Sequence, residues 1–178
     1  MLGQAFQDYE DLLNKNYKDA VAILFAKYGP AADHYFKEKS YHRFLNGKIK
    51  SPVKGQISRS TEGLYCHHID ENRFLNMANA SYILGQKIAF SYQHKDRLVY
   101  CNLTEHLILH ALILRETHGL FGYTGLIQFI QPCVINWYIS GIKPEKDWQK
   151  KCFEMAYMTS DEVSILLNII ATRLASPK

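Results

Sequence analysis

Two groups of histidines, about forty residues apart, constrain this chain more than any other feature of its sequence. His67 and His68 are adjacent, whereas Glu105 and His106 are followed by His110. Residues four apart project from one face of a helix, so the imidazoles of His106 and His110 can hold the same ion. A doublet at a strand end can add a third ligand and a free base. The pattern therefore predicts a strand and a helix that meet at a divalent metal.

The segments around these histidines read as strand, loop, strand and helix. Gly63–Ile69 and Leu98–Cys101 are predicted to be short strands. Either Asn102 or Thr104 can cap the helix that follows, because each side chain can accept a hydrogen bond from a free amide. Glu105 then lies in the first turn, where its negative charge suits the helix dipole.

The rest of the chain is predicted to be mostly helical. Apolar residues recur at helical spacing from Phe6 to Tyr28, and Gly29-Pro30 interrupts the pattern. The stretch 48–60 is polar and is predicted to be a loop or a weak strand. Further helices are expected at 31–45, 77–84, 126–139, 144–157 and 162–174.

A length of 178 residues suits a single domain, 1–178. Within it we distinguish three regions. A helical N-terminal region with a basic loop covers 1–60, a central unit with both histidine groups covers 61–117, and a helical C-terminal region covers 118–178. The predicted fold class is α+β, mostly helical.

Composition excludes several classes of protein. No apolar run reaches the roughly 18 residues that span a bilayer, so no membrane partner is expected. The first residues are polar and acidic, unlike a secretory signal, and we expect a cytoplasmic protein. The cysteines lack the spacing of a zinc knuckle or a disulfide framework. They are Cys66, Cys101, Cys133 and Cys152.

The charge pattern is compatible with a nucleic-acid partner. The net charge of +4 is mild, but the segment 43–60 holds five basic residues and no acidic one. Because this segment leads into the histidine doublet, it can contact a phosphate backbone. A solvated connection is the alternative. The candidate contacts are Arg43, Lys48, Lys50, Lys54, Arg59 and, farther along, Arg73.

The combination of His67-His68-Ile69 with Asn102-Leu103-Thr104-Glu105-His106, followed by His110, resembles the HNH, or ββα-metal, endonucleases of phages and mobile elements. The resemblance covers about a third of the chain, from Gly63 to Glu116. It implies a ββα-metal finger core flanked by N-terminal and C-terminal helices. It also implies hydrolysis of phosphodiester bonds in DNA or RNA.

The resemblance assigns a role to each histidine of the two groups. His67, His106 and His110 would hold the metal, which could be Mg²⁺, Mn²⁺ or Zn²⁺. His68 would be the general base. Histidine suits this role because its ordinary pKa lies near neutrality. A carboxylate such as Asp70 or Glu105 could orient a ligand imidazole.

One position departs from the family pattern. The family's asparagine, which helps to hold the base in line, is here Arg97, preceded by Asp96. The nearest asparagine, Asn102, lies in the turn before the helix. Asp96 or Arg97 could replace the missing residue. Alternatively the site is impaired, and the protein is a binding protein that inhibits or tethers a nucleic-acid enzyme. That enzyme could be a nucleoprotein complex, and the setting would be defence or counter-defence between a host and a mobile element.

A third interpretation is a structural helical protein or a metalloprotein of another kind, which the absence of an HExxH motif makes weaker. We expect the other histidines at the surface or in packing, although His94 could belong to a phosphate-facing loop. We also expect Trp137 and Trp148 in the core. The apolar C-terminal half favours a homodimer. The other histidines are His34, His42, His94 and His118.

Overall fold

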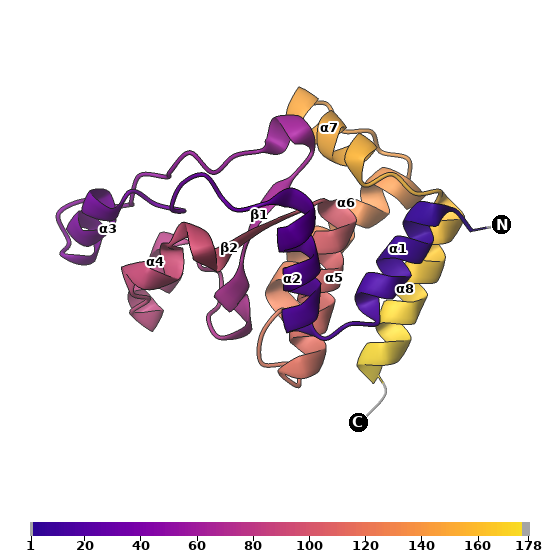
Figure 1. Cartoon of the computed structure of the whole chain (residues 1–178), viewed down its shortest axis with the longest axis horizontal. Coiled ribbons are helices and arrows are strands. Elements are labelled where there is room, and N and C mark those ends of the chain that lie inside the picture. The colour runs from indigo at the N-terminus through magenta and orange to yellow at the C-terminus, as the bar shows by residue number, and fades with distance from the viewer. Residues whose placement is uncertain (1, 176–178) are drawn as a thin grey trace.

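The two predicted strands pair in the computed structural model, which describes residues 2–175 (Figure 1). β1 (Tyr65–His68) runs antiparallel to β2 (Leu98–Cys101), and they form the one sheet of the described chain. α5 (Leu103–Glu116) begins directly after Asn102. Strand, strand and helix therefore follow in the expected order, and the mostly helical α+β class is confirmed.

α5 starts where the sequence can satisfy its free amides. The side chain of Asn102 accepts a hydrogen bond from the backbone N–H of Glu105, and the Glu105 carboxylate accepts one from the N–H of Asn102. This reciprocal pair is a capping box. The cap fixes the start of α5, and with it the positions of His106 and His110.

The sheet separates two hydrophobic clusters because its side chains alternate between its two faces. Val99 and Cys101 pack in the larger cluster, around α5, whereas Leu98 and Tyr100 pack in the smaller one. His67 lies opposite Val99 and His68 opposite Leu98. We infer that the two adjacent histidines point to opposite faces of the sheet.

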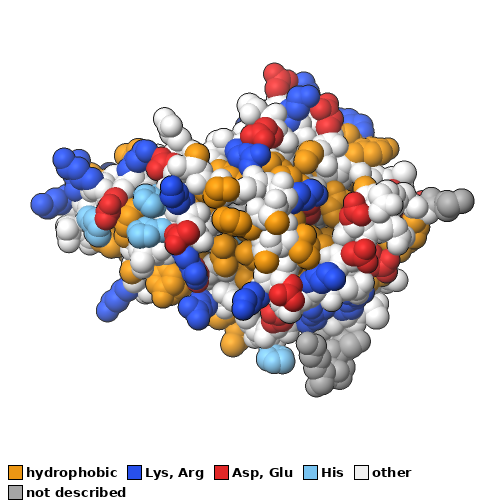
Figure 2. Space-filling model, viewed as in Figure 1, with side chains coloured by type: hydrophobic (Ala, Val, Ile, Leu, Met, Phe, Trp, Pro, Cys, Tyr) orange, Lys and Arg blue, Asp and Glu red, His pale blue; other side chains and the backbone are white. Residues whose placement is uncertain are grey.

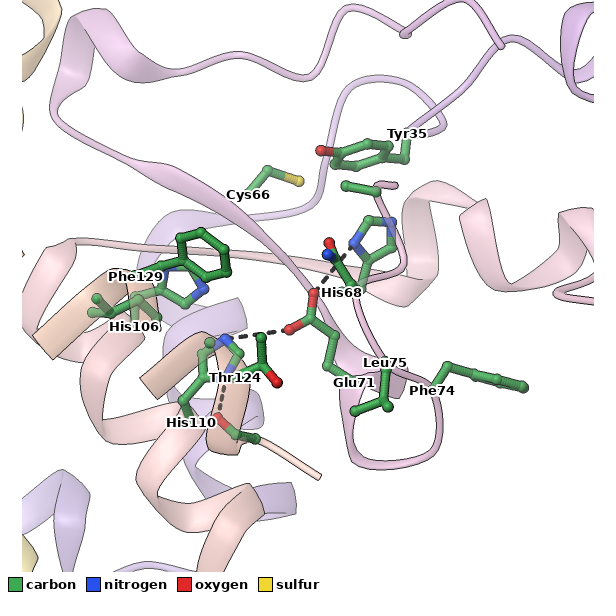
Figure 3. Close-up of a pocket in the computed structure, with 15 residues that line it drawn as sticks. Tyr35, Cys66, His68, Glu71, Phe74, Leu75, His106, His110, Thr124 and Phe129 are labelled. Atoms are coloured by element: carbon green, nitrogen blue, oxygen red, sulfur yellow. Dashed lines mark hydrogen bonds and ion pairs between the residues drawn. The ribbon is translucent and has the colours of Figure 1, made fainter. Parts of the chain in front are cut away.

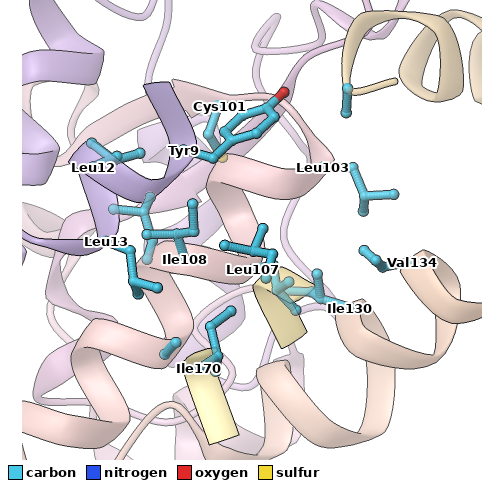
Figure 4. Packing of buried hydrophobic residues seen from close by; sticks show 14 of the residues in the cluster. Tyr9, Leu12, Leu13, Cys101, Leu103, Leu107, Ile108, Ile130, Val134 and Ile170 are labelled. Atoms are coloured by element: carbon cyan, nitrogen blue, oxygen red, sulfur yellow. The ribbon is translucent and has the colours of Figure 1, made fainter. Parts of the chain in front are cut away.

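Helices surround α5 in the larger cluster, as Figures 1 and 4 show. α1 (Gln4–Leu13), α2 (Tyr17–Tyr28) and α8 (Ser160–Ala175) all pack against it. Because α5 is covered on several sides, apolar residues occupy most of its circumference. No helix among residues 2–175 has both the length and the apolar character needed to cross a membrane.

The predicted helix at 31–45 is wrong in its first half. Only α3 (Glu38–Leu45) is helical there. Two preceding amides donate to distant carbonyls instead: Tyr35 to Gln93 at 2.8 Å and Lys37 to Val53 at 2.8 Å. These long-range hydrogen bonds replace the helical ones although the side chains follow a helical pattern.

The other helices exist where the sequence predicts them, with shifted bounds. α4 (Ala80–Gln86) begins after its cap Asn79. Residues 124–139 form one helical run in which π-helical segments flank α6 (Gln131–Val134). α7 (Asp147–Met155) and α8 complete the chain. Asn16 starts α2 by accepting a hydrogen bond from Asp19 N–H, which divides the first predicted helix in two.

Candidate metal centre

Three imidazoles converge where β1 meets α5. The ring centroids of His67 lie 5.2 Å from those of both His106 and His110, which are themselves 4.9 Å apart. One nitrogen of each ring lies within 4.8 Å of the others. His67 Nδ1 and His106 Nε2 are separated by 3.3 Å. This group could hold a metal ion.

Hydrogen bonds on the outer nitrogens orient two of the rings. The Tyr17 hydroxyl donates to the carbonyl of Ile69 at 2.8 Å, so it accepts from His67 Nε2, 2.9 Å away. His110 Nδ1 lies 3.3 Å from the carbonyl oxygen of Gly122, which can only accept. The outer nitrogen of each ring therefore carries a proton, so His67 Nδ1 directs a lone pair inward and His110 Nε2 faces the same space.

Burial keeps the imidazoles of His67 and His106 neutral. It lowers the pKa of His67 to about 3, and neighbouring histidines add to the effect. Burial also holds the pKa of His106 well below its usual range. A neutral imidazole is the form that binds metal, so these two residues can bind an ion without first losing a proton.

Glycines allow the helical run at 124–139 to pack against His110. A Cβ placed on Gly125 would lie 2.2 Å from Cε1 of the His110 ring. One placed on Gly122, where φ is +84°, would lie 2.7 Å from the His110 carbonyl oxygen. No side chain fits in either space, so both glycines are needed for this wall of the site.

His68 lies beside the three-histidine group and is held by a separate set of contacts. Its Nε2 is 2.9 Å from Oε1 of Gln93, whose amide nitrogen donates to the carbonyl of Met77 at 3.2 Å. The amide oxygen of Gln93 thus faces the imidazole, so Nε2 carries the proton and Nδ1 a lone pair. The Tyr35 ring packs on His68 at a centroid distance of 4.2 Å. Burial lowers the pKa of His68.

Glu71 lies between His68 and the three-histidine group, as Figure 3 shows. Its Oε2 is 3.2 Å from His110 Nε2 and 3.8 Å from His67 Nδ1, and its Oε1 is 3.8 Å from His68 Nδ1. Burial alone would raise the pKa of Glu71, but contact with His110 and the nearby His67 hold that pKa well below its usual range.

Sequence reasoning did not identify Glu71 or Gln93. Glu71 had a usable signal, since it follows His67 by four residues and His68 by three, which can bring its side chain back over the doublet. Gln93 had none, because its contact depends on the path of the loop between β1 and β2.

A cavity of about 230 Å³ opens onto these groups (Figure 3). Four of its lining residues are chemically active: His68, Glu71, His106 and His110. Aromatic side chains form much of the remaining wall: Tyr35, Phe74 and Phe129. The cavity thus combines apolar wall residues with titratable side chains.

The other predicted site residues have contacts of their own. Arg97 Nε donates to Asp70 Oδ2 at 2.7 Å, which joins the residue before β2 to the turn after β1. Glu105 accepts from Lys27 Nζ at 2.7 Å in addition to capping α5. Asn102 donates to the Tyr9 hydroxyl at 3.0 Å. Through these contacts Asp70, Arg97, Asn102 and Glu105 connect the chain segments that surround the histidines.

Most of the predicted backbone-contacting residues are exposed, and basic side chains gather around the α3 end of the molecule in Figure 2. Arg59 differs, since it pairs with Glu62 and donates to the carbonyl of Tyr28. Lys54 lies nearest the site, with Nζ 5.5 Å from the centre of the Tyr35 ring that packs on His68. The exposed residues are Arg43, Lys48, Lys50, Lys54 and Arg73.

The remaining histidines lie in packing or at the surface, as expected. His34 and His94 pack with Phe90 at centroid distances of 5.5 and 5.0 Å. His42 and His118 are exposed. Trp137 is buried as predicted, but the prediction for Trp148 is wrong, because its side chain on α7 is 40% exposed.

Comparison with known proteins identifies no family for this chain. No family model matches the chain, and neither does any curated protein or any solved structure. The function is therefore inferred from what the residues can do. Three imidazoles could hold a divalent ion, and a fourth beside them carries a free lone pair.

Proposed function

We propose that this protein is a metal-dependent endonuclease that hydrolyses phosphodiester bonds in DNA or RNA, with β1, β2 and α5 forming an HNH-type ββα-metal finger. One observation carries the proposal. His67, His106 and His110 converge on one point, and His68 lies beside them with its Nδ1 free. The histidines are distributed over strand and helix as the sequence resemblance implies.

The residues present fit a divalent ion. His67 directs a lone pair inward, and the 3.3 Å between His67 Nδ1 and His106 Nε2 suits two ligands of one ion. When bound, the ion supplies positive charge beside the scissile phosphate and its leaving 3′ oxygen. Imidazole ligands favour Mn²⁺ or Zn²⁺ over Mg²⁺.

His68 would act as the general base. Its Nε2 proton is committed to Gln93, so an attacking water can deliver a proton only to Nδ1. Gln93 on one edge and the Tyr35 ring on one face limit rotation of the imidazole. A base held this way needs no reorganisation when substrate arrives.

The departure at the family's asparagine position no longer favours the binding-protein alternative. Arg97 pairs with Asp70 rather than with His68. Gln93, four residues earlier in the chain, provides a contact that orients His68. We therefore favour an active enzyme over an impaired HNH-type binding protein.

Exposed basic side chains would hold the backbone of the nucleic acid on the cavity side. Lys54 is the best placed, because it lies over Tyr35 at the edge of the site. Contacts of this kind are made to phosphates irrespective of base sequence. They make binding weaker as the salt concentration rises.

The proposal is tested with plasmid DNA and structured RNA incubated with the purified protein. Each reaction is run with EDTA, Mg²⁺, Mn²⁺ or Zn²⁺, for the wild type and for the variants His68→Ala and His106→Ala. His118→Ala, an exposed histidine outside the site, is the matched control.

We expect metal-dependent cutting by the wild type and by His118→Ala, and loss of cutting in both site variants. Intact substrates under every condition would overturn the proposal. If His68→Ala still bound nucleic acid in that case, the binding-protein alternative would take its place.

A further inference from the structure

We propose that Glu71 is a fourth ligand of the ion held by His67, His106 and His110. The centre would then combine three imidazoles with one carboxylate, and a substrate oxygen would enter as a fifth ligand. The resemblance to HNH proteins assigns no role to this residue, and the proposal comes from the geometry of its carboxylate.

The first argument is the spacing of the ligand atoms. Tetrahedral ligands about 2.0–2.1 Å from an ion lie roughly 3.3 Å from one another. Glu71 Oε2 is 3.2 Å from His110 Nε2, and His67 Nδ1 is 3.3 Å from His106 Nε2. The separation of 3.8 Å between Glu71 Oε2 and His67 Nδ1 is about half an ångström longer. Glu71 lies outside the group of ligand atoms that are all within 4.8 Å of one another, so its side chain must move toward that group to bind the ion.

The second argument is charge. The Glu71 side chain is only 19% exposed, and within the described chain its ion-pair contacts are all with histidines. Two of these histidines, His67 and His68, are themselves almost fully buried. A carboxylate charge in such surroundings is costly unless a cation compensates it. A divalent ion at the three-histidine group would provide that compensation.

A simple ion pair between Glu71 and a protonated His110 is the rival explanation. It accounts for the distance of 3.2 Å between these two side chains. It leaves the contact between His67 Nδ1 and His106 Nε2 to a separate hydrogen bond. A bound ion explains both contacts at once.

The second oxygen of Glu71 gives the carboxylate a further task, which rests on the proposed function. Oε1 faces His68 Nδ1 at 3.8 Å, so one carboxylate joins the metal ligands to the base. A proton received at Nδ1 would be stabilised by this negative charge.

The test measures metal binding without substrate. Affinity for Zn²⁺ is determined by competition with a chromophoric chelator, and the coordination of Co²⁺ is followed by its visible absorption spectrum. The variant is Glu71→Gln, which keeps the shape of the side chain. Glu154→Gln is the matched control, because this exposed carboxylate on α7 pairs with Lys151.

We expect Glu71→Gln to bind Zn²⁺ about 10- to 100-fold more weakly and to alter the Co²⁺ spectrum, whereas Glu154→Gln keeps both. Equal affinity and an identical spectrum in Glu71→Gln would overturn the assignment. Circular dichroism checks that each variant is folded. If Glu71→Gln does not fold, Glu71→Asp is measured in its place, with the same two outcomes.

This inference and the proposed function fail separately. An unchanged Glu71→Gln variant would remove the fourth ligand and leave the three-histidine site and the nuclease intact. A wild type that binds metal through Glu71 but cuts no nucleic acid would support the fourth ligand and overturn the proposed nuclease function.

Discussion

Gln93 holds His68 through its side-chain oxygen, 2.9 Å from Nε2, and so leaves Nδ1 as the only nitrogen of that imidazole able to accept a proton. Gln93 is itself fixed, because its amide nitrogen donates to the carbonyl of Met77. The orientation of the proposed base therefore depends on a residue outside both histidine groups.

Replacing Gln93 with Leu should slow cleavage without removing the metal. Leu is similar in size but cannot accept the Nε2 proton, so the imidazole of His68 loses its fixed orientation. We expect single-turnover cleavage to fall roughly tenfold to a hundredfold, part of the 10²–10⁴ that a general base supplies. Metal content, measured on the same preparation, should stay equal to that of the wild type. An unchanged cleavage rate would show that Gln93 does not position the base.

Replacing Gly125 with Ala should disturb His110. The new methyl group would lie 2.2 Å from the ring, so the helical run at 124–139 or the imidazole must move. We expect a loss of about 1–3 kcal/mol in the free energy of unfolding, together with weaker metal binding.

The matched control is Gly85→Ala in α4, where a Cβ meets nothing within 4 Å. This change should leave metal binding alone and leave stability unchanged or raise it by about 0.4–1 kcal/mol. Thermal unfolding with and without Zn²⁺ measures both effects. Similar behaviour of the two variants would contradict the packing of Gly125 against His110.

Replacing Lys54 with Ala should weaken binding of nucleic acid while leaving the metal in place. Lys54 lies over the Tyr35 ring at the edge of the site, where a phosphate next to the cleaved one would lie. The slope of the logarithm of affinity against the logarithm of salt concentration should become shallower by about one. Lys150→Ala, at an exposed position on α7, serves as the control. Equal slopes for both variants would show that Lys54 does not contact the nucleic-acid backbone.

Acid should weaken the attachment of the N-terminus to α8. The Glu162 carboxylate accepts hydrogen bonds from the backbone N–H groups of Gly3, at 2.7 Å, and Thr159, at 3.0 Å, and these lower its pKa below the usual 4.5. A group whose pKa is lower in the folded state stabilises the fold above its unfolded pKa and loses that effect as the pH falls.

The stability difference between the wild type and Glu162→Gln should therefore be constant near neutral pH and shrink as the pH falls below about 4.5. Urea unfolding at a series of pH values measures this difference. A difference that did not change with pH would mean that the carboxylate charge of Glu162 makes no contribution.

The parts of the site that follow local rules could be predicted from the sequence. The separation of four residues between His106 and His110 fixes their common face once Asn102 caps the helix. The strand at 98–101 has the bounds predicted for it. These features depend only on neighbouring residues.

The parts that depend on long-range contacts could not be predicted. Gln93 reaches His68 from a 3₁₀ turn in the loop between the strands, and Glu71 turns back over the doublet. The residues before α3 look helical by pattern, but the amide of Tyr35 bonds to the carbonyl of Gln93. Hydrophobic spacing records which side chains are buried. It does not record which distant carbonyl a backbone amide will find.

The most direct measurement of the central claim is anomalous X-ray diffraction from crystals soaked in Zn²⁺ or Mn²⁺, collected at the absorption edge of the metal. The account predicts one strong peak about 2.0–2.2 Å from His67 Nδ1, His106 Nε2 and His110 Nε2, with Nδ1 of His68 facing it across the cavity. The absence of a peak among these three nitrogens, or a peak bound by other residues, would contradict it.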